Sequence, residues 1–111
     1  MFVLKKDPIV RWPIQIPQPT DDGNVNPIPV TVEYRLLPQA RYDELKGSDA
    51  ELLREVVVGW NDDAFGQEDE SGRAVALPFS SEALNQLIEF AFVRTGLVQG
   101  YWQAVAGLEK N

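Results

Sequence analysis

A strict alternation of apolar and polar residues near the start of the chain limits the fold more than any other feature. Large apolar side chains stand at every second position there, as Val10, Trp12, Ile14 and Ile16. A period of two places all of them on one face of a β-strand. Pro8, Pro13 and Pro17 interrupt the same stretch and have no N–H to donate. The sequence therefore predicts a strand at the edge of a sheet, or one that pairs on a single side.

A second alternating stretch follows after a turn signal. The turn cluster is Thr20–Asn24, which contains two aspartates and a glycine. Beyond it, the apolar side chains that recur with a period of two are Val30, Val32, Tyr34 and Leu36. The two stretches together predict an antiparallel hairpin with a long loop. The apolar faces of the strands need a cover, which only helices later in the chain can provide.

The middle of the chain changes to helical spacing. Residues 39–46 predict a short helix that Gly47 ends. Ser48 and Glu51 then form the S-x-x-E pattern of a capping box. The helix after it carries an apolar stripe, and Gly59 marks the expected end of its regular part. The stripe consists of Leu52, Leu53, Val56, Val57 and Trp60.

The last third of the chain contains a loop and two further helices. Residues 61–72 form a polar, acidic loop, and residues 75–79 are apolar and predicted to be extended. Ser80 is the expected N-cap of a helix with Glu82 in its first turn. A final helix is expected over about residues 92–106.

These elements predict an α+β fold in which an N-terminal antiparallel β-hairpin or small sheet packs against about four C-terminal helices. The length of 111 residues and the hydrophobic content of 44% suit one domain over residues 1–111. Within it, residues 1–38 form the β-rich part and residues 39–108 the helical part.

The composition narrows the functional classes. The chain has no cysteine and no histidine, which excludes disulfides, thiolate chemistry and most zinc sites. Its net charge of −7 disfavours nucleic acid as a partner. The acidic stretch Asp62–Glu70 lacks the alternation of a calcium loop, so a solvated turn is the better interpretation. We expect no catalytic residue, no metal and no cofactor.

The start of the chain does not have the pattern of a signal peptide, and no stretch is long and apolar enough to span a membrane. We therefore expect a location in the bacterial cytoplasm and no membrane partner.

The last helix has small residues at a four-residue spacing, which leave a smooth groove along one side. Glycine inside a helix costs about 1 kcal/mol relative to alanine, so close approach of another element should offset it. Two interpretations stay open: internal packing within this chain, or docking of a partner's helix or of another copy. The candidate partner-binding residues are Gly96, Gly100, Tyr101, Trp102 and Ala104. If the groove is a docking site, Gly100→Leu and Trp102→Ala leave the fold largely intact.

Several segments of the chain resemble one known family. The most specific part is Val56–Trp60 followed by Leu77–Ser80, and the order of segments around it agrees. The supporting segments are Glu51–Glu55, Ser81–Leu84, Phe92–Arg94, Lys6–Pro8 with Trp12–Ile14, and Tyr34–Pro38. In this order the chain resembles the tail assembly chaperones of long-tailed bacteriophages, found in prophages.

The resemblance implies a role without catalysis. Such proteins bind the long, apolar, helical tape measure protein, help to recruit tail tube subunits, and are not retained in the mature virion. It implies these two proteins as partners and allows self-association into a homo-oligomer. Three other readings stay open: a structural component of the tail or virion, a general bacterial protein-interaction module, and a small enzyme.

Overall fold

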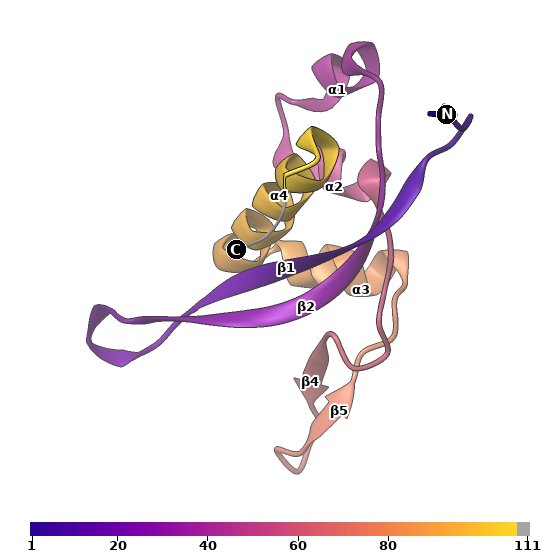
Figure 1. Ribbon diagram of the computed structural model, residues 1–111. Coiled ribbons are helices and arrows are strands. Elements are labelled where there is room, and N and C mark those ends of the chain that lie inside the picture. Colours follow the sequence, from indigo (N-terminus) through magenta and orange to yellow (C-terminus); the bar gives the residue numbers. More distant parts are fainter. Residues whose placement is uncertain (109–111) are drawn as a thin grey trace.

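The computed structural model describes residues 1–108 and has an α+β fold. A long β-hairpin runs across the helices, and its turn end projects beyond them (Figure 1). A second, small hairpin extends below the long one in this view (Figure 1). The elements in chain order are β1 (Ile9–Pro19), the 3₁₀ turn η1 (Asp21–Gly23), β2 (Val25–Arg35), α1 (Gln39–Leu45), α2 (Asp49–Val56), β3 (Val57–Trp60), β4 (Gly66–Glu68), β5 (Ala74–Ala76), α3 (Ser81–Ile88) and α4 (Ala91–Ala106).

The first hairpin confirms both predicted strands, but it has a tighter turn than predicted. β1 pairs antiparallel with β2 from Ile9 opposite Arg35 to Pro19 opposite Val25. Thr20–Asn24 alone connect the strands, and the Thr20 N–H donates to the Asn24 carbonyl at 2.8 Å. Asp22 and Gly23 have positive φ angles of 65° and 75°, which these turn residues adopt readily. The expected long loop is wrong because the strands continue through their prolines.

The prolines of the hairpin all stand where no ladder hydrogen bond is lost. The Leu36 N–H donates to the Pro8 carbonyl at 2.8 Å, which identifies one hydrogen-bonded pair. In an antiparallel ladder such pairs alternate with pairs whose N–H groups point away from the partner strand. The prolines of β1 and β2 all fall at these intervening positions: Pro13, Pro17, Pro19, Pro27 and Pro29. A slip of one residue would place them in the ladder, so they help to fix the register.

The order β1-β2-β3 in the sheet places β1 at an edge, as its prolines predicted. Because Pro13, Pro17 and Pro19 remove N–H groups from that edge, a second strand finds few donors there.

The apolar stripe predicted between Leu52 and Trp60 lies partly in a helix and partly in a strand. The Ser48 hydroxyl accepts from the Glu51 N–H at 3.3 Å, as the predicted cap requires. However, α2 ends at Val56, and Val57–Trp60 pair with β2 as β3. The expectation of a helix reaching Gly59 is therefore wrong, because the β-branched run Val56–Val58 favours an extended backbone.

The acidic segment after β3 also contains unpredicted structure. Residues 66–68 and 74–76 form the small hairpin β4–β5, where a loop was expected. The expected extension of residues 75–79 agrees with β5 only at its start. Both strands are exposed along their length, so apolar patterning did not reveal them.

The two C-terminal helices, α3 and α4, lie where the sequence predicted them. The Ser80 hydroxyl accepts from the Ala83 N–H at 2.9 Å and caps α3. Along the other helix, α4, the glycines face β1 and β2. A Cβ on Gly96 would lie 2.8 Å from the Gln15 carbonyl oxygen, and one on Gly100 would lie 2.8 Å from Tyr34 Oη. The helix backbone is therefore in direct contact with the sheet, which a side chain at either position would prevent.

Two buried tyrosines connect the sheet, α4 and the segment before α1. Tyr34 on β2 donates from Oη to the Leu97 carbonyl of α4 at 2.8 Å. Tyr101 on α4 accepts at its Oη from the Leu37 N–H at 3.1 Å. Their rings pack edge to face with centroids 5.6 Å apart. Burial raises the pKa of Tyr34 far above its usual value and also raises the pKa of Tyr101.

The close contact of α4 predicts that a methyl group cannot be added at Gly100. In Gly100→Ala the new Cβ would lie 2.9 Å from Ile14 Cβ, and overpacking of this kind costs about 1–3 kcal/mol. The higher helix propensity of alanine offsets about 1 kcal/mol of this cost, so the free energy of unfolding should still fall. Urea denaturation measures the change, with the exposed neighbour Gln99→Ala as the control that changes little. A Gly100→Ala protein as stable as the wild type would contradict the close contact.

The raised tyrosine pKa values predict a loss of stability at high pH. In the unfolded chain these tyrosines ionise near pH 10, whereas the folded protein keeps them protonated above that pH. The unfolded state therefore binds fewer protons above pH 10, and the free energy of unfolding falls by about 1.4 kcal/mol per pH unit through Tyr34 alone, with Tyr101 adding to the fall. Denaturation at several pH values tests this. Tyr34→Phe should have a shallower decline, and an unchanged slope would contradict the assignment.

Candidate binding surfaces

The structure divides the five candidate residues of the last helix into two groups. Trp102 is exposed, with 62% of its surface accessible. The other four are buried, namely Gly96, Gly100, Tyr101 and Ala104. The chain's own β1 occupies the small-residue face of α4, so the structure supports the alternative of internal packing for these four residues.

This placement reverses one expectation from the sequence. Gly100→Leu was expected to leave the fold intact if the groove were a docking site. A side chain there would meet Ile14 and Tyr34 in the core, so the substitution should instead disrupt the packing of α4 on the sheet. Trp102 keeps its place as a candidate because it points away from that contact.

Trp102 lies beside a hollow lined mainly by apolar side chains. We call this hollow the Trp102 hollow. Its volume is about 180 Å³, and it lies where α1, α2 and α4 meet. Gln99 contributes the amide group of the lining, which consists of Tyr42, Leu52, Val98, Gln99, Tyr101 and Trp102. An exposed tryptophan at the rim of an apolar hollow is typical of a binding hot spot. Val98 and Trp102 lie one helical turn apart on the same face of α4, so both can contact one partner helix.

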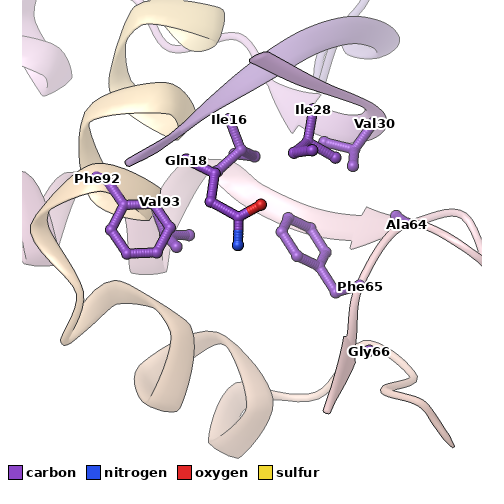
Figure 2. Close-up of a pocket in the computed structure, with 9 residues that line it drawn as sticks. All are labelled: Ile16, Gln18, Ile28, Val30, Ala64, Phe65, Gly66, Phe92 and Val93. Atoms are coloured by element: carbon purple, nitrogen blue, oxygen red, sulfur yellow. The ribbon is translucent and has the colours of Figure 1, made fainter. Parts of the chain in front are cut away.

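A second hollow lies under the projecting hairpin, and we call it the hairpin hollow. Figure 2 shows side chains from β1, β2, α4 and the segment before β4 surrounding a common space. Its volume is about 320 Å³. The amide of Gln18 projects into the space, and the other lining residues carry apolar side chains or, at Gly66, none: they are Ile16, Ile28, Val30, Ala64, Phe65, Gly66, Phe92 and Val93. Sequence reasoning missed this site because its lining comes from segments far apart in the chain.

An aromatic cluster holds one wall of the hairpin hollow in place. Trp60 of β3 donates from Nε1 to the Leu77 carbonyl at 2.9 Å. The rings of Phe65 and Phe79 pack edge to face on the indole, with centroids 4.7 Å and 4.9 Å away. These contacts fix Phe65 at the start of the β4–β5 hairpin, and Trp60, the last residue of the apolar stripe noted in the sequence, is buried.

The acidic segment is organised as a turn. One carboxylate oxygen of Asp69 accepts from the Ser71 N–H at 2.9 Å, the Ser71 hydroxyl at 2.6 Å and the Arg73 N–H at 2.9 Å. These hydrogen bonds, with the Ser71 hydroxyl first, lower the pKa of Asp69. Within residues 1–108, no cluster of acidic side chains has the geometry to hold a metal ion.

The other perturbed carboxylates belong to ion pairs and hydrogen bonds on the helices. Arg41 on α1 donates from Nε to a Glu55 carboxylate oxygen of α2 at 2.5 Å, which lowers the pKa of Glu55. Hydrogen bonds from Gln39 and Lys46 lower the pKa of Asp43. A general acid needs a raised pKa near neutrality, and these groups are shifted in the opposite direction.

Comparison with known proteins gives no match to a family model, to a curated protein or to a solved structure. None of the helices within residues 1–108 has the length and apolar character needed to cross a membrane.

Proposed function

We propose that this protein is a non-catalytic binding protein that holds an apolar helix of a partner at the Trp102 hollow. The observation that carries the proposal is the exposure of Trp102 beside an apolar hollow, next to a neighbour, Tyr101, that is fully buried. A folded domain that leaves a tryptophan in solvent at such a place gains most when a partner covers it.

The geometry suits a helical partner. Val98 and Trp102 contribute apolar side chains from α4, and Tyr42 of α1 also lines the hollow. An amphipathic helix docks on such a surface through side chains spaced by three or four residues. The net charge of −7 would help to keep the complex with an apolar partner in solution.

The sequence resemblance gives the proposal a specific form, a tail assembly chaperone whose partner is the tape measure protein. The two segments that carry most of the resemblance, Val56–Trp60 and Leu77–Ser80, contact each other through the Trp60–Leu77 hydrogen bond. In this proposal the protein acts in the bacterial cytoplasm, helps to recruit tail tube subunits, and leaves before the tail is complete. Mass spectrometry of finished particles separates a chaperone, which is missing from them, from a structural tail component.

The proposal predicts that Trp102→Ala weakens partner binding without loss of the fold. Loss of a hot-spot tryptophan costs about 2 kcal/mol or more, which is about a thirtyfold weaker affinity. The measurement is binding of a tape measure segment to the purified protein, together with solubility of that segment on co-expression.

Phe90→Ala is the matched control, because Phe90 is also an exposed aromatic residue but lies at the other end of α4. Thermal unfolding of both variants should match that of the wild type. Equal binding by wild type and Trp102→Ala, or equal weakening by the two variants, would contradict the assignment of the surface.

A further inference from the structure

The N-terminal segment, residues 1–6, presents apolar side chains with no cover. The exposed fractions are 86% for Phe2, 66% for Val3 and 77% for Leu4. Two cations, Lys5 and Lys6, follow directly. The segment joins the body at a fixed point, because Asp7 pairs with Arg35 at 2.8 Å and the Pro8 carbonyl accepts from Leu36.

The hairpin hollow has the complementary character. Apart from Gln18, the side chains that line it are apolar, and the chain around its Phe65 wall is acidic, with Asp62 and Asp63 just before that wall and Glu68 just after it. Asp63 also lines an adjoining hollow that shares Val30 and Ala64 with the first. None of these three carboxylates takes part in an ion pair within residues 1–108. Phe2 and Leu4 would therefore meet a hollow whose side chains are mainly apolar, and Lys5 and Lys6 would lie near its carboxylates.

The size of the hollow also fits such a segment. In an extended chain, Phe2 and Leu4 project from the same face. A volume of about 320 Å³ lies at the lower end of the range for ligand pockets, which suits a few side chains more than a whole helix.

The segment cannot reach the hollow of its own chain. From Pro8 the strand runs about 27 Å to Ile16, which lines the hollow, at about 3.4 Å per residue. The stretch from Pro8 back to Phe2 covers at most about 20 Å. The N-terminus also lies at the opposite end of the hairpin from the projecting turn (Figure 1). A segment of this sequence in the hollow must come from another molecule.

We infer that the N-terminal segment of one copy docks in the hairpin hollow of a second copy, with Phe2 and Leu4 inserted and Lys5 and Lys6 beside the carboxylates of residues 62–68. The contact joins two different surfaces, so each copy uses its own segment and offers its own hollow. Such head-to-tail contacts produce rings or open chains of copies. The inference does not rest on the Trp102 hollow or on the proposed partner.

A mixing experiment with two complementary full-length variants tests this contact. Phe2→Ser with Leu4→Ser removes the apolar segment and leaves the hollow intact. Gln18→Lys with Asp63→Lys places cations at the hollow, at positions exposed to solvent, and leaves the segment intact. Light scattering and sedimentation should show wild type associating with increasing concentration, less so at high salt. Each variant alone should stay monomeric, and the equimolar mixture should form a 1:1 dimer, since one intact contact remains.

The matched control is Gln15→Lys with Glu70→Lys, which makes the same charge change at exposed positions outside the hollow. It should associate as the wild type does, and thermal unfolding should show that all variants are folded. A wild type that stays monomeric at every concentration would overturn the inference and leave the hollow to a different partner. Association of the Phe2→Ser, Leu4→Ser variant, or a mixture that stays monomeric, would also overturn it.

Discussion

The contact between the backbone of α4 and the strand β1 is the constraint on which the rest of this structure depends. Gly96 and Gly100 let the helix approach so closely that a Cβ at these positions would collide with the Gln15 carbonyl, Ile14 and Tyr34. At that distance Tyr34 reaches the Leu97 carbonyl, so the sheet and helix share a buried hydrogen bond as well as apolar contact. A β-hairpin alone is marginal in water, and this helix gives β1 its cover. The same orientation turns Trp102 outward.

Much of the fold could be predicted from the sequence because its signals are local. The period of two in β1 and β2, the prolines at the edge, and the Ser48 and Ser80 caps each act within a few residues. β3 could not be predicted, because its side chains continue the helical stripe of α2 and only pairing with a distant strand makes them extended. The β4–β5 hairpin has no buried face to give it a pattern.

The candidate sites also combine features that local sequence predicts with features that depend on contacts between distant segments. The spacing of Gly96 and Gly100 signalled close packing, but the sequence could not say whether the packed element was β1 or a partner. Adjacent helical residues point about 100° apart, so a buried Tyr101 leaves Trp102 facing another direction. The hairpin hollow depends on Trp60 fixing Phe65 near Ile28, which brings together two segments that are far apart in the chain. The hairpin hollow therefore includes the hairpin that α4 holds in place, whereas the Trp102 hollow lies between α4 and the helices α1 and α2.

Native-state hydrogen exchange tests this coupling most directly. If the contact holds the domain together, the amides of β2 around Tyr34 and those of α4 around Leu97 open only in global unfolding. Both sets should then show the same opening free energy, equal to that of the whole domain, and the same dependence on denaturant. Exchange of the α4 amides at a markedly lower free energy, with the hairpin still protected, would show that the sheet is stable without the helix and would contradict the account.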